Sequence, residues 1–252
     1  MSYICTMVVK SNIAVVTGDI VGSSMLNAEE RSLFLEKVKS FNAENILLGP
    51  EFYRGDSFQL ATYLQYSLLI ALKIRAEIKC INDMNDVRIS IGIGKISDWK
   101  ENILLATGSA FERSGKNLDR LKKMGLNLLV ITGNRELDDE LETYCELIDP
   151  YLKNLSANQA NIVRLKIEGA IKRQLKQKER GNNTELTTTH KKATTATTHA
   201  NTTNTTQADI STQLNISQPA VSKSLKAANW KVIERFIKRY EQIIDKNYGT
   251  SE

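Results

Sequence analysis

Two aspartates stand where paired carboxylates could do chemistry. Asp19 follows an apolar, β-branched run that starts at Ser11, and Asp56 lies beside Gly55 at the tip of a hairpin predicted over 52–63. If these strands are neighbours in one sheet, both carboxylates lie at the same edge. Such a pair can hold Mg²⁺ or Mn²⁺, which takes its remaining oxygen ligands from substrate phosphates. An aspartate in a turn also commonly accepts bonds from backbone amides, so that role stays open for each.

Basic side chains are expected near these carboxylates, where they could grip a phosphate: Arg54, Arg113, Lys116 and Arg120. The last three recur at helical spacing, so a solvated helix face explains them equally well. Gly92 and Gly94 alternate in a strand, which by itself indicates only room for close packing.

The elements that position these residues form an α+β domain over residues 1–150. Periodicity predicts the order β-α-β-β-α-β-α-β-α, with helices covering one side of a mainly antiparallel sheet, as in ferredoxin-like folds. Besides the first strand and the hairpin, we expect helices over 28–45, 65–83, 106–124 and 134–148, and strands over 87–96 and 126–133. The apolar side of the first helix is predicted to consist of Leu33, Phe34, Val38 and Phe41.

Four strings in this half resemble a known family: VVTGDIVGSS, YRGDSFQ, RISIGIGKI and ATGSAFERSGKNLDRL. In order and spacing they are similar to the motifs of the bacterial SatD-like proteins, divergent relatives of class III nucleotidyl cyclases, and the hairpin is similar to that of GGDEF diguanylate cyclases. The resemblance covers most of residues 12–132. It implies a cyclase-like palm domain in which Asp19, the Ile20 carbonyl and Asp56 bind metal. We also expect nucleotide contacts at Gly22, Ser23, Arg54 and Arg113.

The chain departs from the cyclase pattern at the remaining functional positions. Phe52 stands where cyclases place a base-selecting lysine, and Glu112 and Lys116 replace an asparagine and an arginine. A carboxylate would repel phosphate unless a metal intervened, and lysine is not equivalent to arginine at a charge-stabilising site. The resemblance therefore favours metal or nucleotide binding over catalysis, with Glu112 and Lys116 as the only catalytic candidates.

The segment 207–230 has the pattern of a helix-turn-helix unit. Ala208, Ile210 and Leu214 are expected on one side of a short helix, which residues 215–217 interrupt. Ser217 is a suitable N-cap for a second helix, and Pro219 lies in its first turn, where a missing N–H costs nothing. Val221 and Leu225 form the expected buried stripe of that second helix.

The outward residues of the second helix are donor-rich and lack carboxylates: Gln218, Ala220, Ser222, Lys223 and Lys226. That composition suits a DNA major groove, although a helical hairpin with a lysine-bearing face is the alternative. The string ISQPAVSKSLKAA resembles the turn and recognition helix of many bacterial helix-turn-helix regulators. The resemblance implies that Gln218 and Lys223 read bases, while Ser217 and Ser222 contact phosphates.

Flanking helices are expected to complete an all-α domain over 151–252. A helix over 155–175 has Ser156 as a possible cap, and a closing amphipathic helix begins at Trp230. Between them, residues 184–206 contain 12 threonines among 23 residues, which predicts a disordered insertion at about 176–206. The expected apolar contacts are Ile162, Leu165, Ile167 and Ile171 in the first helix, and Val232, Phe236, Tyr240 and Ile243 or Ile244 in the last.

Charge divides unevenly between the halves of the 252-residue chain. Residues 1–150 carry 17 Lys+Arg against 21 Asp+Glu, whereas residues 151–252 carry 17 against 8. The basic half contains the helix-turn-helix pattern, which favours phosphate neutralisation and salt-sensitive binding.

The cysteines and histidines exclude some site classes. Cys5, Cys80 and Cys145 are too few and too dispersed for a zinc cluster, and His190 and His199 both lie in the threonine-rich run. No apolar run reaches the roughly 18 residues of a membrane span, and we expect no export signal. These features favour a cytoplasmic protein with buried thiols.

Three functions follow as hypotheses. The first is a homodimeric regulator that binds double-stranded DNA and whose palm domain senses a nucleotide, metal or partner. The second is a Mg²⁺- or Mn²⁺-dependent nucleotidyl cyclase-type enzyme fused to a DNA-binding domain. The third is a palm domain retained only for dimerisation.

Overall fold

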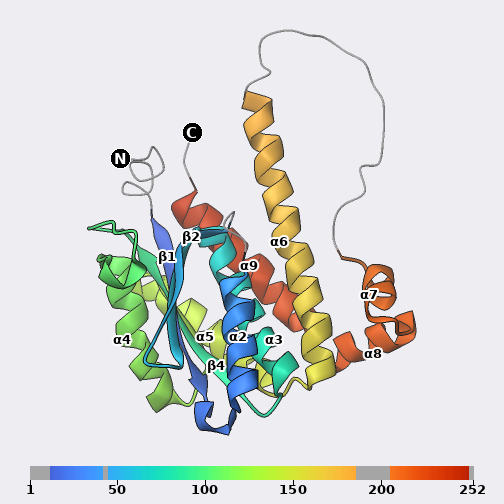
Figure 1. Cartoon of the computed structure of the whole chain (residues 1–252). Helices are drawn as coiled ribbons and strands as arrows, with labels where there is room; N and C mark the ends of the chain where they lie inside the picture. The colour runs from blue at the N-terminus through green and yellow to red at the C-terminus, as the bar shows by residue number, and fades with distance from the viewer. Residues whose placement is uncertain (1–11, 42–44, 186–204, 250–252) are drawn as a thin grey trace, which may run out of the picture.

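A five-stranded mixed sheet lies at the centre of the N-terminal half (Figure 1). The computed structural model describes residues 12–41, 45–185 and 205–249, and for 178–185 the backbone alone. The strand order is β2-β3-β1-β4-β5, in which β5 runs parallel to β4 and the other neighbours are antiparallel. The strands are β1 (Ile13–Val21), β2 (Ile46–Tyr53), β3 (Ser57–Thr62), β4 (Asp86–Gly94) and β5 (Leu128–Ile131).

Helices cover both faces of this sheet, so the expectation of one-sided coverage was wrong. Alternate residues of β1 point to opposite faces. Val16 packs toward α2 (Ala28–Lys39) and α3 (Leu64–Ile81), whereas Val15 packs with Ala110 of α4 (Ser109–Met124). The α+β character is as predicted, and the second layer was missed.

Two glycines of β4 explain how α4 approaches the sheet so closely. A Cβ on Gly92 would lie 2.2 Å from the Ala110 carbonyl oxygen, and one on Gly94 would lie 2.7 Å from the Ala110 nitrogen. Real Cβ atoms do not approach backbone to these distances. The alternating glycines therefore allow α4 to pack closely on the sheet, which is the packing role that the sequence pattern indicated.

The hairpin and its preceding helix differ from the prediction in extent. Helix α2 ends at Lys39 rather than Asn45, and β2 already begins at Ile46; residues 42–44 lie outside the described part. Pro50 lies within β2, and β2 is an edge strand, where a sheet tolerates proline. Leu33, expected on the apolar side of α2, is 43% exposed, whereas Phe34 and Val38 are fully buried.

Helix α5 (Arg135–Lys153) continues through the predicted stop at Asp149 and Pro150. Asp149 is fully buried, and its carboxylate accepts bonds from the Arg75 guanidinium at 2.6 Å and the Asn127 backbone N–H at 3.0 Å. These contacts hold the end of the helix against α3 and β5. Pro150 lies near the last turn of α5, so the hydrogen bond that its missing N–H removes is close to the end of the helix. The short 3-10 turns η1 (Ser23–Met25) and η2 (Ile103–Leu105) complete this half.

The C-terminal helices share one hydrophobic core with the sheet layer. They are α6 (Ala157–Glu185), α7 (Gln207–Leu214), α8 (Gln218–Ala227) and α9 (Trp230–Tyr248). Helices α6 and α9 pack against α3, and the Tyr240 hydroxyl of α9 lies 2.6 Å from the Ser67 hydroxyl of α3. A single apolar cluster extends from β1 to Ile244. Core packing therefore crosses the expected boundary at residue 150.

Both ends of this helical region differ from the prediction in detail. Helix α6 runs past Leu175 to Glu185, so the beginning of the expected insertion is helical, and residues 186–204 lie outside the described part. In α9, Val232 is 38% exposed and Ile233 and Ile237 are buried in its place, beside the predicted Phe236, Tyr240, Ile243 and Ile244. The buried face of α9 begins with Trp230 itself.

Candidate functional site

Helix α7 is fixed at both ends by local hydrogen bonds. The Thr206 hydroxyl accepts from the Asp209 backbone N–H at 3.1 Å, and the Asp209 carboxylate accepts from the Thr206 N–H at 2.7 Å. These bonds from Thr206 lower the pKa of Asp209. Asn215 ends the helix in the left-handed conformation at φ 51°, which asparagine tolerates better than most residues. Ile210 is buried, but Ala208, expected beside it, is exposed.

The turn leads directly into α8. The Ile216 N–H donates to the Ser211 carbonyl at 3.1 Å, and the Ser211 hydroxyl donates to the Ile216 carbonyl at 2.6 Å. Ser217 caps α8, because its hydroxyl accepts from the Ala220 N–H at 3.4 Å. Val221 and Leu225 are buried, so the predicted cap, start and apolar stripe of this helix are confirmed.

The outward face of α8 has the composition expected from the sequence. Each residue proposed for DNA contact is exposed: Ser217, Gln218, Ala220, Ser222, Lys223 and Lys226. The helix contains no Asp or Glu, so nothing on it would repel a phosphate backbone. The placement of these side chains agrees with the sequence, and their role in DNA contact stays a prediction.

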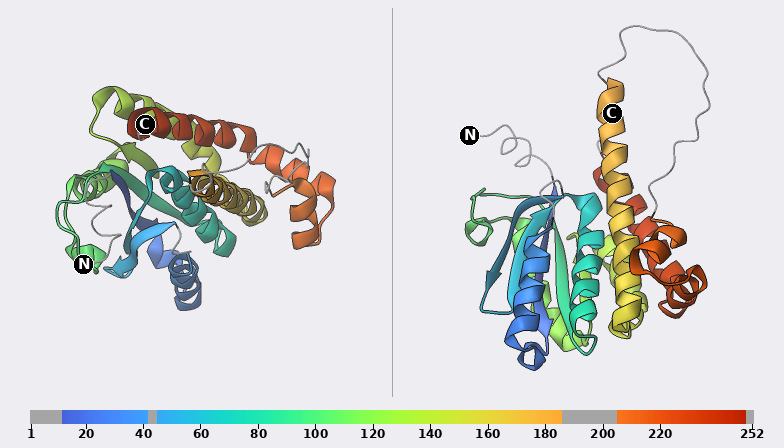
Figure 2. Two further views of the ribbon diagram at one scale, coloured as in Figure 1. Left: turned by 90° about the horizontal axis from the view of Figure 1, so that it is seen from above. Right: turned by 45° about the vertical axis from the view of Figure 1, so that its right-hand side comes forward.

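Helices α7 and α8 project from the side of the molecule away from the sheet (Figures 1 and 2). Helix α8 packs against α6, α7 and α9, and the first residue of α9, Trp230, is 7% exposed. Lys166 of α6 also donates to the Thr205 carbonyl at 3.0 Å, just before α7. The unit is therefore anchored on the two helices that pack against α3.

Asp19 lies near the end of β1, and two cations neutralise it. The Arg88 guanidinium of β4 donates to both carboxylate oxygens at 2.9 and 3.0 Å, and the Lys122 ammonium of α4 lies 3.2 Å from one of them. The sheet register places Arg88 directly opposite Asp19. Lys122 also lies 3.9 Å from the Asp119 carboxylate, one turn earlier on α4.

Asp56 lies at the same end of the sheet, as predicted. The Ile20 N–H donates to the Asp56 carbonyl at 3.1 Å, and the Asp56 carboxylate accepts from the Ser23 hydroxyl at 2.9 Å and the Ser57 hydroxyl at 3.3 Å. Gly22 precedes the 3-10 turn and has φ 69°, a backbone conformation that favours glycine. The backbone alone therefore explains a glycine at this position, whether or not it contacts a nucleotide. The Asp56 carboxylate is therefore held by two side-chain hydroxyls.

The predicted basic cluster does not form. Arg113 donates to the Ile93 carbonyl and lies over Gly133, at the opposite end of the sheet from Asp19. From Arg113 to Lys122 the helix rises by roughly 13 Å at 1.5 Å per residue. Glu112 and Lys116 are exposed and pair with each other at 3.5 Å, and Arg120 pairs with Glu142 at 2.6 Å. The prediction was wrong because α4 runs along the strands. Its first turns lie near Ile93 and its last turns near Asp19, so its basic residues do not gather at one place.

Residues that sequence reasoning missed surround Asp19 instead. Besides Arg88 and Lys122, the neighbouring positions include Tyr53 of β2, whose pKa is raised by burial and, more weakly, by Asp19, while Arg54 lowers it. On the same sheet face, Gln59 donates to the Thr17 hydroxyl at 3.0 Å. Arg88 Nε and the Ser90 hydroxyl are buried without a hydrogen-bond partner among the described residues. Strand pairing could have revealed Arg88, because the alternation of β4 places it on the Asp19 face.

This donor set does not fit a two-metal centre as it stands. A cation at Asp19 would have to displace both Arg88 and Lys122, and Asp56 is engaged by two hydroxyls. Within the described ranges, no group of three or more His, Cys, Asp or Glu side chains is arranged to hold a metal ion. The two cations that contact Asp19 suit an anionic ligand better than a metal ion.

Comparison of the chain with known families, curated proteins and solved structures finds no match. The SatD-like resemblance therefore stays a prediction. Among the described helices, none is both long and apolar enough to span a membrane.

Proposed function

We propose that this chain is a DNA-binding transcriptional regulator in which α8 enters the major groove. The observation that carries the proposal is the exposed, carboxylate-free face of α8, which presents Gln218, Ser222, Lys223 and Lys226 beyond a buried stripe. Lysines neutralise phosphates, and glutamine has the donor and acceptor pair that matches adenine. In a homodimer, two such helices would lie about 34 Å apart, one turn of DNA.

We further propose that the sheet domain senses a nucleotide or another phosphate-bearing ligand at Asp19. Lys122 has a side chain 49% exposed and contacts Asp19 at 3.2 Å and Asp119 at 3.9 Å, while Arg88 pairs with Asp19. A ligand phosphate could take over the Lys122 contact while Arg88 stays paired with Asp19. Such a ligand can act on DNA binding only through different affinities for two states of the protein.

The contacts of Asp19 support sensing more than cyclase-type catalysis. Glu112 and Lys116 pair with each other at the surface of α4, and Asp19 is neutralised by cations. Phosphoryl transfer depends on groups positioned around the reacting phosphate, which these two residues do not provide. A domain retained only for dimerisation would bind no phosphate ligand, so a ligand-binding test separates it from a sensor.

Fluorescence anisotropy with a labelled, mixed-sequence DNA duplex tests the DNA proposal. We expect binding that weakens steeply between about 50 and 200 mM salt, because lysines release counterions from the duplex. The double substitution Gln218→Ala with Lys223→Ala should weaken binding and reduce the slope of log K against log salt by about 1. Lys123→Ala removes an equal charge from α4 and should change neither quantity. Unchanged, salt-insensitive binding by the double variant would refute the assignment.

A thermal-shift panel of nucleoside triphosphates, inorganic phosphate, Mg²⁺ and Mn²⁺ tests the sensing proposal. A ligand that binds the folded state must raise the melting temperature. We expect a phosphate compound to stabilise the wild type and to lose most of this effect in Lys122→Ala. The adjacent, exposed Lys123→Ala is the matched control and should respond like the wild type. Equal responses of all three proteins would place the ligand elsewhere.

A further inference from the structure

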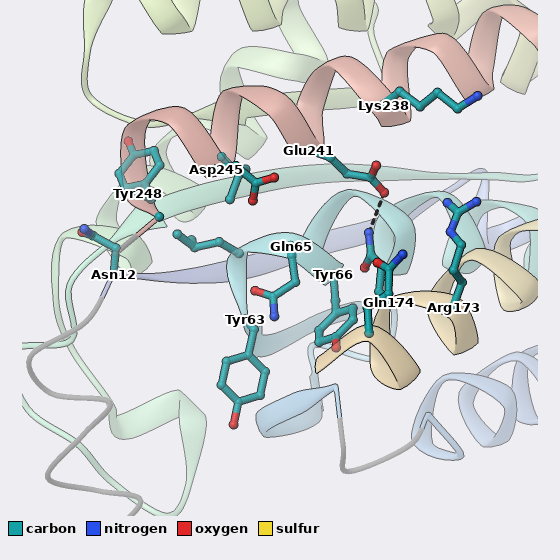
Figure 3. A pocket seen from close by; sticks show the side chains of 14 residues that line it. Asn12, Tyr63, Gln65, Tyr66, Arg173, Gln174, Lys238, Glu241, Asp245 and Tyr248 are labelled. Carbon is teal, nitrogen blue, oxygen red and sulfur yellow. Dashed lines mark hydrogen bonds between the residues drawn. The ribbon is translucent and has the colours of Figure 1, made fainter. Parts of the chain in front are cut away.

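A pocket of about 680 Å³ lies where the sheet domain meets the helices that support the DNA reader. Its walls are the first turn of α3, the middle of α6 and the C-terminal half of α9 (Figure 3). Its volume lies within the range of small-molecule sites, roughly 300–1,000 Å³. It is separate from Asp19, which does not line it.

Charged groups are separated along this pocket. Lys238 and Arg173 lie toward one end, Asp245 lies toward the other, and Glu241 lies between them (Figure 3). The lysine is also 3.8 Å from Glu234, an exposed i,i+4 contact of the kind that contributes little. Two cations and two carboxylates make this lining neutral overall, which favours a ligand that itself carries both charges.

One polar atom in the wall indicates what the ligand must supply. The Gln174 amide nitrogen donates to the Glu241 carboxylate at 2.6 Å, which joins α6 to α9. The amide oxygen of the same side chain is buried and has no hydrogen-bond partner among the described residues. A buried acceptor without a partner is unfavourable, and a donor from a ligand would satisfy it. Gln174, Glu241 and Asp245 together offer acceptors for the N–H groups of a ligand.

The spacing of the charges sets the length of the ligand. Lys238 and Asp245 are seven positions apart on α9, or roughly 10 Å along the helix axis. An extended peptide spans about 3.3–3.6 Å per residue, so about three residues cover this distance. Asn12 and Gln65 also line the pocket, and their amides can pair with a peptide backbone.

We propose that this pocket binds a short peptide of about three residues with free termini. Its amino terminus lies against Asp245, its carboxylate lies against Lys238 and Arg173, and Gln174 and Glu241 between them accept bonds from its N–H groups. Because α6 and α9 also hold α8, the peptide lies against the two helices that support the DNA reader. Any effect of the peptide on DNA affinity rests on the proposed function, but the binding itself does not.

Thermal shift of the full-length protein with three tripeptide libraries of mixed sequence tests the binding. The first library has free termini, the second is N-acetylated and the third is C-terminally amidated; free glycine is a fourth probe. We expect the first to raise the melting temperature by about 2–4 °C at fivefold excess over Kd, and the others to have little effect. Equal stabilisation by the blocked libraries, or none by the first, would overturn the proposal. Stabilisation by glycine alone would replace the peptide by an amino acid, and so also overturn it.

Two conservative variants locate the site. Glu241→Gln and Asp245→Asn keep the shape of the wall but remove the carboxylates, and each should weaken tripeptide binding at least tenfold. Glu146→Gln makes the same change at an exposed position of α5 and should bind like the wild type. Wild-type affinity in both pocket variants would contradict the assignment. DNA anisotropy of the same proteins without peptide tests the DNA reader separately, so failure of either proposal can be recognised.

Discussion

The substitution Arg75→Met should strongly destabilise the protein, because it removes the cation from a buried cluster of charges. Arg75 is 1% exposed, and its guanidinium donates to Asp86 at 2.9 Å and to Asp149 at 2.6 Å. Methionine keeps much of the side-chain length but leaves both carboxylates buried. Asp86 retains Asn127 and the Val87 N–H, which cannot neutralise a charge, whereas Asp149 retains the Lys153 ammonium at 2.8 Å, so the uncompensated charge is that of Asp86.

Removing one partner of a buried ion pair costs about 3–5 kcal/mol, a large part of a typical total of about 5–15 kcal/mol. For a chain of this size the melting temperature should fall by roughly 6–20 °C. Urea denaturation followed by circular dichroism at pH 7 measures the change directly. The double variant Arg75→Met with Asp86→Asn should recover most of the loss, because Asp149 keeps its ion pair with Lys153 and no uncompensated buried charge remains.

The pH dependence of this loss follows from Asp86. Burial alone would raise the pKa of Asp86, but the charge and hydrogen bonds of Arg75 outweigh it and hold that pKa below its usual value. In the wild type this contribution is therefore complete above about pH 4 and is lost as pH falls further. In Arg75→Met burial dominates, the carboxyl pKa rises, and protonation removes the uncompensated charge. The deficit should shrink between pH 7 and pH 5. A deficit below about 1 kcal/mol, or one independent of pH, would refute this account.

Three further predictions concern local packing. Gly92→Ala should cost about 1–3 kcal/mol in urea denaturation by pushing α4 outward, whereas Gly115→Ala, with open space at its Cβ, should stabilise slightly; equal effects would contradict the packing argument. Asn215→Val should cost about 1–2 kcal/mol because of its positive φ, whereas Asn215→Gly should be close to neutral, and hydrogen exchange of α7 can detect the difference. Tyr240→Phe should cost about 1 kcal/mol by removing the bond to Ser67; a neutral result would mean that this hydroxyl pair does not stabilise the α3–α9 contact.

Local signals in the sequence were enough to predict the helix pair α7–α8. Ser217, Pro219, Val221 and Leu225 act through capping, backbone restriction and helical periodicity, which are properties of one short segment. The alternating strands and the position of Asp56 beside Asp19 at one sheet edge were predictable for the same reason.

Contacts between distant elements could not be predicted in this way. The Arg88 and Lys122 pairs with Asp19 depend on strand register and on the direction of α4. The long α5 depends on Asp149 meeting Arg75, and the shared core depends on Tyr240 reaching Ser67. Periodicity gives the faces of an element but not the neighbour that each face meets, so the second layer over the sheet and the joined core were missed.

Photocrosslinking from α8 tests the central claim most directly. A photoreactive benzoylphenylalanine replaces Ala220, which is exposed on the outward face of α8, or Lys100, which is exposed on the sheet domain. With a labelled DNA duplex at low salt, we predict a covalent adduct from position 220, loss of the adduct at high salt, and little from position 100. No adduct from position 220, or equal adducts from both positions, would contradict DNA contact by α8.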